Sequence, residues 1–390
     1  MFAHEVTKNF IFTKYVVFLQ ENYTVSAHEL TIYSMKNENH KIRIKDIATL
    51  AGVSEGTVDR VLHNRGEVSE KSRLAVEKVL DEINYSPNLL ARSLASKKHF
   101  RFAYLIPEHQ PKDYWEIVNE GFTVAAHDFL QYNIHLEKHL FNQYDVQSFF
   151  NASSQILLSK PDAVIIAPIF KEETIKLTEM LSLNQIPFSF IDSMVEEADF
   201  LTYYGQNSFQ SGYIAAKLIL QSLPENGKVV IIRTKRKGAV SNQTIARKNG
   251  FIHYINSKGL AMIQLIDVEL TDDDENENYK SLHEVFIKNN DIKAVITFNS
   301  KVSRLANHLE KMNRKDIRLI GYDLLEENIK YLKKDVISYL LGQRPDKQAY
   351  FTVRDICTKL ILKQEVKQIN YVPIDILIKE NIEDYLQFGK

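Results

Sequence analysis

The chain has 390 residues, of which 44% are hydrophobic and 25% are charged, the balance of a soluble globular protein with two or three domains. The 49 Lys and Arg residues nearly cancel the 50 Asp and Glu residues, which excludes a polycation, and the single cysteine, Cys357, excludes a disulfide framework. Lys14 interrupts the longest early apolar run, at 10–19, and no cleavage site follows it. We therefore expect no membrane span and no secretory signal, and we place the protein in the cytoplasm.

Residues 1–40 are rich in aromatic side chains but have no helical or strand period. Segments without such a period seldom form a core. We predict a poorly ordered extension. A start of translation at Met35 and a functional arm are the alternative interpretations.

Residues 41–85 have the apolar spacing of three short helices. The spacing i, i+3, i+4, i+7 holds in the first helix for Ile44, Ile47, Ala48 and Ala51, and a similar spacing holds in the third for Val76, Val79, Leu80 and Ile83. Gly52-Val53-Ser54 separates the first helix from a second at about 55–62, which Ser54 caps, and Ser69 caps the third. Three helices with a three-residue turn between the first two predict a helix-turn-helix head.

The segment 86–99 predicts a hinge helix or linker. Ser86 and Pro87 suit the start of a helix, but only about two to three turns fit before the polar residues 96–99. Helices shorter than about 12 residues are marginal on their own. We expect this helix to form only when a partner supports it.

From residue 100 onward, short apolar runs alternate with amphipathic stretches. The runs lie at 102–106, 163–167, 188–191, 229–232, 294–297 and 319–322, and the stretches include 145–159, 172–183, 209–220 and 246–257. This alternation predicts an α/β domain with parallel sheets flanked by helices. Because a single core seldom exceeds about 250 residues, we expect two lobes with a ligand cleft between them, at the carboxyl ends of the strands.

Motifs of catalytic and metal sites are missing from the sequence or out of context. Residues 52–56 match the nucleophile elbow G-x-S-x-G, but that elbow needs a strand before it, and here a helix precedes it. No phosphate-binding glycine loop occurs, and His28-Glu29 and His283-Glu284 lack the second histidine of a zinc-protease helix. Cys357 shares a helix face with apolar residues, which predicts an inert core thiol. We predict no enzyme activity, no cofactor and no metal.

Charge is divided unevenly along the chain. Residues 41–98 contain eleven Lys and Arg residues against eight Asp and Glu residues, so this segment is +3 and the remainder is −4. A basic head on an acidic body is typical of a protein whose head faces phosphates.

Three stretches, IRIKDIATLAGVSEGTVDRVL at 42–62, VSEKSR at 68–73 and NYSPNLLARSL at 84–94, resemble the head and hinge of the lactose/galactose repressor (LacI/GalR) family. Farther on, Arg247-Lys-Asn-Gly-Phe, Phe298-Asn-Ser, Ile320-Gly-Tyr-Asp and Gly342-Gln-Arg-Pro resemble the effector domain of that family, which is similar to type I periplasmic sugar-binding proteins. The resemblance implies a head at 41–85, a hinge at 86–99 and an effector-binding domain at 100–390. Lobe one would comprise about 100–205 and 344–366, and lobe two about 206–343 and 367–390.

The resemblance also implies which residues contact DNA. They are Arg43, Lys45, Ser54, Glu55, Gly56, Thr57, Arg60, His63, Asn64, Tyr85, Asn88, Ala91, Arg92 and Leu94. Arg60 would donate to guanine and Glu55 would accept from cytosine. Asp59 departs from the serine that is usual in the family, and we expect it to hold Arg60 in place. Leu94 would wedge into the minor groove and kink the duplex; packing of Leu94 on its own domain is the alternative.

Seven residues of the body match effector-binding positions of the family: Tyr114, Trp115, Asp192, Arg247, Asn299, Asp323 and Gln343. The two aromatic residues would stack on a sugar ring, and the polar groups would hold its hydroxyls in fixed forks. Ser193 follows Asp192 where sugar binders often have arginine. For each residue taken singly, a structural role is the alternative.

Together these features predict a cytoplasmic transcription regulator that binds double-stranded DNA at a near-palindromic operator as a homodimer. Its effector is predicted to be a small molecule, a sugar or sugar derivative. One alternative is a cytoplasmic sugar-binding sensor or transport-type solute-binding protein that does not bind DNA, which a complete head disfavours. The other is a sugar-processing enzyme, which the lack of a placed acid, base or metal disfavours. Whether the effector releases DNA or promotes binding stays open.

Overall fold

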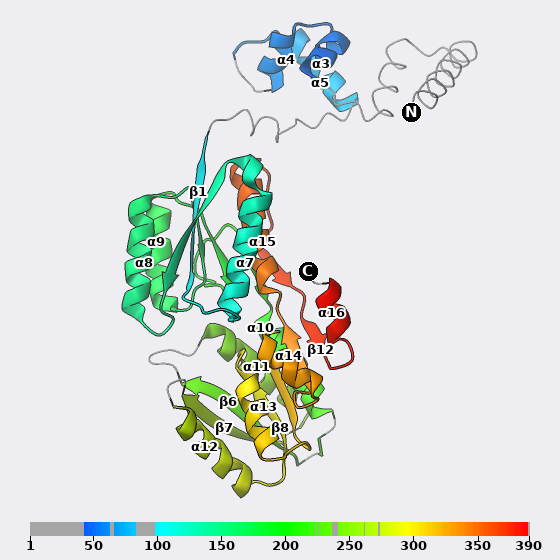
Figure 1. The fold of residues 1–390 in the computed structure, drawn as a ribbon. Helices are drawn as coiled ribbons and strands as arrows, with labels where there is room; N and C mark the ends of the chain where they lie inside the picture. Colours follow the sequence, from blue (N-terminus) through cyan, green and yellow to red (C-terminus); the bar gives the residue numbers. More distant parts are fainter. Residues whose placement is uncertain are drawn as a thin grey trace, which may run out of the picture. The chain divides into compact units, whose positions relative to one another are not determined.

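The computed structural model describes residues 43–62, 66–82, 98–221, 223–224, 226–235, 241–260, 262–271 and 274–388. The chain divides into two compact units, Met1–Leu89 and Leu90–Lys390. We call the described residues of the first unit the head and those of the second the body (Figure 1). The predicted extension at 1–40 and most of the predicted hinge lie outside the described residues.

The described part of the head consists of the helices α3 (Ile44–Ala51), α4 (Glu55–Leu62) and α5 (Glu70–Glu82). Their apolar faces meet in one small core, formed by Ile47, Ala48, Val58, Val76 and Val79. Gly52 ends α3 with a φ of 63°, the left-handed region that favours glycine. The Ser54 hydroxyl caps α4 by accepting a hydrogen bond from the Thr57 amide at 3.2 Å. The predicted helix-turn-helix is confirmed.

The first lobe of the body is built on a parallel sheet. Among the described residues this sheet has six strands in the order β11-β5-β4-β3-β1-β2. Their bounds are β1 (Phe100–Pro107), β2 (Ile134–Phe141), β3 (Ala163–Ile166), β4 (Phe188–Asp192), β5 (Tyr203–Gln206) and β11 (Ile369–Val372). Helices α7 (Tyr114–Asp128) and α15 (Pro345–Leu360) cover one face, and α8 (Val146–Ser159) and α9 (Lys171–Leu183) cover the other. A short 3-10 helix, Leu130–Tyr132, follows α7.

The second lobe repeats this arrangement with one antiparallel edge. Its six strands among the described residues have the order β12-β10-β9-β8-β6-β7, and β12 runs antiparallel to β10. They are β6 (Lys228–Lys235), β7 (Gln264–Thr271), β8 (Ile292–Thr297), β9 (Arg318–Tyr322), β10 (Tyr339–Gly342) and β12 (Asp375–Leu377). Helices α10 (Ser208–Leu220) and α11 (Asn242–Ser257) pack on one face. Helices α12 (Glu275–Lys288), α13 (Val302–Lys311), α14 (Glu326–Lys333) and α16 (Ile382–Phe388) pack on the other. The predicted α/β fold with parallel sheets is confirmed.

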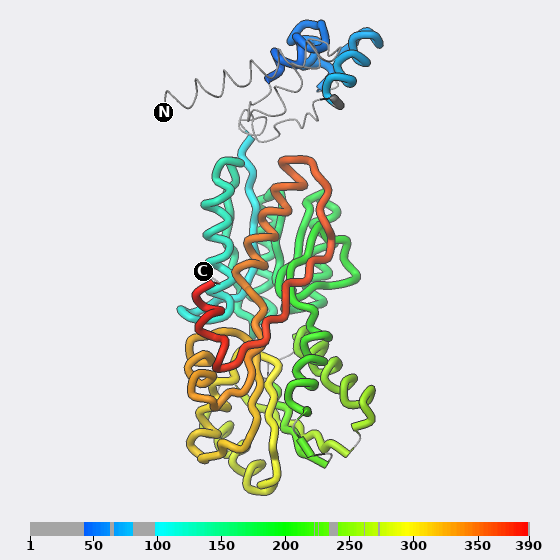
Figure 2. The backbone as a smooth tube through the Cα atoms, turned by 90° about the vertical axis from the view of Figure 1, so that its right-hand side faces the viewer, coloured from blue at the N-terminus to red at the C-terminus, as the bar shows by residue number. Residues whose placement is uncertain are grey.

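The chain passes between the lobes after β5, after β10 and after β11 (Figure 2). We expected residues 367–390 to belong to lobe two, and this assignment is wrong for β11. This strand pairs with β5 in parallel, Ile369 beside Tyr203 and Val372 beside Gln206, and so completes the edge of the first sheet. The last crossing therefore lies between β11 and β12.

Candidate functional site

Seven of the predicted DNA-contacting residues lie in the described part of the head. Arg43 and Lys45 lie at the start of α3, and Ser54, Glu55, Gly56, Thr57 and Arg60 lie at the start of α4 or within it. All but the half-buried Thr57 are exposed. Helix α4 thus presents a carboxylate and a small glycine in its first turn and a guanidinium in its last turn to solvent, and the two charged groups can reach base edges. His63, Asn64, Tyr85, Asn88, Ala91, Arg92 and Leu94 lie outside the described residues.

Arg60 is held within its own helix. Its Nε donates to the carbonyl of Gly56, one turn earlier, at 3.1 Å. Among the described residues this carbonyl, and not the carboxylate of Asp59 that we expected, positions the guanidinium. The hydrogen bond turns Arg60 toward the amino-terminal end of α4.

In the body, five of the seven predicted effector residues meet between the lobes in a chain of hydrogen bonds. The Tyr114 hydroxyl donates to Oδ1 of Asp192 at 2.6 Å within the first lobe. In the second lobe, the Arg247 guanidinium donates to Oε1 of Gln343 at 2.8 Å, and Nε2 of Gln343 donates to Oδ1 of Asp323 at 2.7 Å. All five side chains are buried.

Gln243 joins the two halves of this chain, and the sequence did not single it out. Its Nε2 lies 3.2 Å from Oδ1 of Asp192 in the first lobe and 3.3 Å from Oε1 of Gln343 in the second. Gln243 precedes Arg247 by four residues on α11, so both project from the same helix face. That spacing is the signal that would have found it. We call Tyr114, Asp192, Gln243, Arg247, Asp323 and Gln343 the interlobe network.

The two carboxylates of the interlobe network follow the ends of central strands. Asp192 is the last residue of β4 and Asp323 directly follows β9. Both have left-handed backbone conformations, with φ of 67° and 71°. Non-glycine residues rarely adopt this region, and when they do they concentrate at ligand sites. The backbone thus turns both carboxylates out of their sheets at the edges that face the other lobe.

Arg247 is the positive centre of the interlobe network. Only 1% of its surface is exposed. Its Nη1 donates to the carbonyl of Phe298 at 2.8 Å, and its guanidinium lies 3.9 Å from the centre of the Tyr322 ring. Its Nε has no hydrogen-bond partner among the described residues. The network therefore contains a donor that a ligand could satisfy.

Burial shifts the proton affinity of two members of the interlobe network. It raises the pKa of Asp323 to about 7, with a smaller upward push from Asp192, while Arg247 and Gln343 oppose the shift. Burial and the neighbouring Asp192 raise the pKa of Tyr114 well above its usual value. Tyr114 is therefore a hydrogen-bond donor at neutral pH, and Asp323 is poised between its two protonation states.

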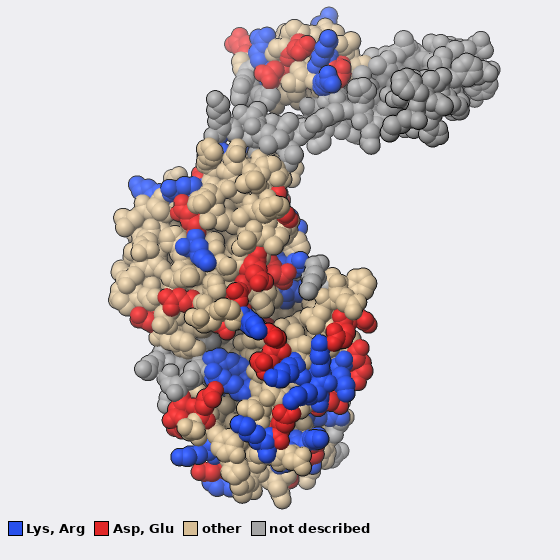
Figure 3. Space-filling view, in the orientation of Figure 1, with Lys and Arg blue, Asp and Glu red and all other residues tan. Residues whose placement is uncertain are grey.

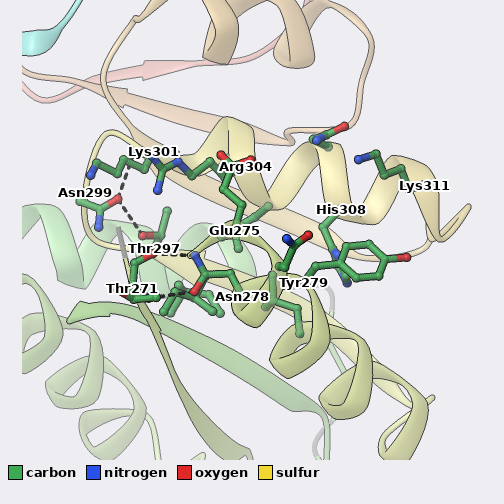
Figure 4. Close-up of a pocket in the computed structure, with 16 residues that line it drawn as sticks. Thr271, Glu275, Asn278, Tyr279, Thr297, Asn299, Lys301, Arg304, His308 and Lys311 are labelled. Atoms are coloured by element: carbon green, nitrogen blue, oxygen red, sulfur yellow. Dashed lines mark hydrogen bonds between the residues drawn. The ribbon is translucent and has the colours of Figure 1, made fainter. Parts of the chain in front are cut away.

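The other two predicted effector residues do not join the interlobe network. Trp115 packs into the core of the first lobe and meets the Tyr114 ring edge-on, with 5.1 Å between ring centres. Asn299 accepts hydrogen bonds from the Thr297 hydroxyl and the Lys301 amide. It lines a separate cavity of about 200 Å³ in the second lobe (Figure 4).

A cavity of about 340 Å³ adjoins the interlobe network. Both lobes line it, with Ser193 and Tyr203 from the first and Phe209 and Gln243 from the second. Gln206 also lines it, and its Oε1 has no hydrogen-bond partner in the described part of the chain. A ligand has room to enter beside Gln243 and Asp192 before it replaces the hydrogen bonds between them.

Other polar contacts also join the lobes, among them the buried hydrogen bond from Nε2 of Gln206 to the carbonyl of Gly342 at 2.9 Å. Nζ of Lys112 in the first lobe lies 2.6 Å from Oε2 of Glu326 in the second. Nζ of Lys301 lies 3.5 Å from the Tyr144 hydroxyl. Lys112 and Glu326 are both exposed, so solvent screens the attraction between them and this pair contributes little to stability. The part-buried hydrogen bonds of Gln243 and the buried one of Gln206 are the stronger candidates for holding the lobes together.

Within the described ranges, no group of three or more His, Cys, Asp or Glu side chains is arranged to hold a metal ion. Among the same residues, no helix is both long and apolar enough to span a membrane.

Two family models match the chain. The model of bacterial regulatory proteins of the lacI family matches residues 43–88, and the model of a periplasmic binding protein domain matches residues 102–364. A solved structure of a candidate LacI transcriptional regulator from Bacteroides fragilis is 36% identical with a TM-score of 0.70, and the match covers 74% of this chain and all of that one.

Two further relatives are transcriptional regulators by name. The HTH-type transcriptional regulator MalR of Streptococcus pneumoniae is 25% identical over 289 residues, which are 72% of this chain and 83% of the relative. The ribose operon repressor of Lactococcus lactis is 25% identical over 295 residues, 72% of this chain and 80% of the relative.

Proposed function

Since the chain belongs to the LacI family of DNA-binding transcriptional regulators, we propose that a carbohydrate bound between its lobes controls its affinity for a near-palindromic operator. The protein acts in this proposal as a cytoplasmic homodimer. The family is one of regulators and not of enzymes. The observation that carries the proposal is the interlobe network, in which buried carboxylate, guanidinium and amide groups from both lobes meet at the ends of strands.

The head supports the DNA-binding part of the proposal. Helix α4 has eight residues, with the exposed Glu55 and Gly56 in its first turn and the exposed Arg60 in its last turn. A helix this short reaches only a few base pairs. Two copies related by a two-fold axis double the contacts and match a palindromic site.

The chemistry of the interlobe network supports a polyhydroxylated ligand. Hydroxyl groups donate and accept at once, so they suit a site that combines acceptors such as Asp192 with donors such as Arg247. Nε of Arg247 and Oε1 of Gln206, which have no hydrogen-bond partner in the described part of the chain, are a donor and an acceptor of this kind. A relative of this chain is named as a ribose operon repressor, which agrees with a sugar as the effector.

Binding at the interlobe network couples to the arrangement of the lobes. A ligand that contacts Asp192 in the first lobe and Asp323 in the second must compete with the hydrogen bonds that Gln243 already makes. Its affinity therefore differs between lobe arrangements that keep these bonds and arrangements that do not. Only such a difference in affinity can shift the equilibrium between two states of the protein.

Selection of DNA from a pool of random duplexes by the purified full-length chain tests the proposal. We expect enrichment of one motif whose two halves are inverted repeats about one helical turn apart. Addition of single monosaccharides to the enriched duplex then identifies those that change its affinity. No enriched motif would remove the DNA-binding part of the proposal, and no response to any sugar would remove the carbohydrate part.

A further inference from the structure

The cavity in the second lobe lies apart from the interlobe network. It lies between α12 and α13, at the carboxyl ends of β7 and β8 and beside Ile232 in the middle of β6 (Figure 4). Apolar side chains form its floor: Ile232, Leu270, Leu282 and Leu305. No member of the interlobe network lines it. The carboxyl ends of parallel strands are the usual location of ligand sites in open α/β sheets.

His308 lines this cavity and is buried, with 4% of its surface exposed. Neither of its ring nitrogens has a hydrogen-bond partner among the residues that the structure describes. The rings of Tyr279 and His308 make an edge-to-face contact, with 4.8 Å between their centres. Buried polar atoms are nearly always paired with protein, water or ligand. The two nitrogens therefore point to an occupant that can both donate and accept hydrogen bonds.

The cavity that would hold this occupant is also lined by positively charged side chains. Lys301, Arg304 and Lys311 line the cavity, and Glu275 is the one acidic side chain among the described residues that line it. The three cationic residues and His308 occupy positions i, i+3, i+7 and i+10 of one helical segment, which is the spacing of a single helix face. On the face seen in Figure 3, charged side chains are more crowded over the second lobe than over the first.

His308 does not add a charge of its own at neutral pH. Burial, with smaller contributions from the neighbouring His283 and Lys311, lowers its pKa to about 4. The ring is neutral at pH 7, with one nitrogen as a donor and the other as an acceptor. Close approach of an anion would favour the charged ring and raise this pKa.

We propose that this cavity binds a small organic phosphate, whose ring packs on Tyr279 and the apolar floor and whose phosphate faces Lys311, Arg304 and His308. The apolar floor accounts for the ring, and the cationic helix face accounts for the anion. A phosphate monoester also meets the unpaired nitrogens of His308, because its oxygens accept hydrogen bonds and its protonated form donates one. The protein then has a second ligand site besides the interlobe network.

Isothermal titration calorimetry of the full-length chain with phenyl phosphate tests this site. We expect saturable binding with a Kd below about 1 mM. Benzyl alcohol, which keeps the ring without the charge, and inorganic phosphate, which keeps the charge without the ring, should each bind at least roughly tenfold more weakly. Equal binding of benzyl alcohol, or no saturable binding of phenyl phosphate at about 10 mM, overturns the proposal.

Variants locate the bound phenyl phosphate. Lys311→Gln and His308→Phe should each weaken binding roughly tenfold. Lys280→Gln, which removes an exposed charge of α12 that does not line the cavity, should change it less than about twofold. If His308→Phe fails to fold, Lys311→Gln alone decides the outcome.

Two further results would overturn the proposal. Loss of phenyl phosphate binding in Asp323→Ala would place the ligand in the interlobe network instead. Altered self-association of Lys311→Gln in sedimentation, together with unchanged binding, would mean that a second copy of the chain occupies the groove. The operator experiments do not enter this test, so its failure is distinguishable from failure of the proposed function.

Discussion

At the scale of single residues, Asp323 combines a large pKa shift with a central position in the interlobe network. Its pKa is raised from 3.8 to about 7, mainly by burial. An acid whose pKa is higher in the folded than in the unfolded protein opposes folding once it ionises. This penalty is absent below about pH 4, grows as the pH rises toward 7 and is fully present above it.

Asp323→Asn removes the ionisable proton and keeps the oxygen that accepts from Gln343. We expect the free energy of unfolding to rise by roughly 1–3 kcal/mol at pH 8 and to change little at pH 4. Urea unfolding of both proteins at the two pH values measures the difference. An equal effect of the substitution at pH 4 and at pH 8 would show that Asp323 does not take up a proton on folding.

Arg60 is the residue of α4 best placed to read a base. Loss of its guanidinium in Arg60→Ala should reduce affinity for the selected operator by about 1–3 kcal/mol and relax preference at one base pair in each half-site. Lys45→Ala is the control, because an exposed lysine on α3 that contacts phosphate should weaken binding to all duplexes alike. Fluorescence anisotropy with the operator and its single-base variants distinguishes the two. Unchanged base preference in Arg60→Ala would remove it from direct readout.

Residue identity in the interlobe network was predictable from the sequence only in part. Motifs located Tyr114, Asp192, Arg247, Asp323 and Gln343, because strand ends at one edge of a sheet converge. Motifs do not specify rotamers, so the sequence could not tell that Trp115 turns into the core while Tyr114 reaches Asp192. Gln243 was missed because a glutamine carries little signal without its contacts.

At the scale of elements, six of the eight interior strands among the described residues were predictable, whereas the interior strands β5 and β10 and the edge strands were not. β1, β3, β4, β6, β8 and β9 are largely apolar runs, because a central parallel strand is buried on both faces. β2 and β7 lie at sheet edges, and most of their residues are exposed or half-buried, so they do not form the apolar runs by which the interior strands were predicted. The short β11 carried no signal of which sheet it would join.

The packing of α10 against α11 positions two members of the interlobe network. A Cβ atom added at Gly250 would overlap the carbonyl of Phe209, and one at Gly212 would overlap that of Arg247. These glycines let the helices approach closely enough to place Gln243 and Arg247 toward the first lobe.

Gly250→Ala should force the two helices apart. Overpacking of this kind lowers the free energy of unfolding by about 1–3 kcal/mol. Asn256→Ala, at an exposed position of the same helix, should stay within about 0.5 kcal/mol of the wild type. Urea unfolding checks both. A Gly250→Ala protein as stable as the Asn256→Ala control would show that the contact yields without strain.

At the scale of the whole molecule, the body is two lobes joined by three crossings, with buried polar groups from both lobes facing each other. For the lobes to move, Gln243 must release Asp192, and other interlobe contacts such as Lys112–Glu326 and Lys301–Tyr144 must also change, while Arg247, Gln343 and Asp323 can stay together in the second lobe. A sugar that supplies hydroxyls to both sides replaces those bonds. The effector response therefore depends on Asp323 and Asp192 as a pair, one from each lobe.

Operator affinity of wild type and Asp323→Ala, titrated with monosaccharides that include D-ribose, tests this account most directly. We expect one of the sugars to change wild-type affinity at least roughly tenfold, and we expect Asp323→Ala to lose that response. Without sugar, the variant should bind the operator within about 1 kcal/mol of wild type, because Asp323 belongs to the body and not to the DNA-binding head. A variant that still responds at the wild-type sugar concentrations would contradict the account and show that Asp323 has only a structural role.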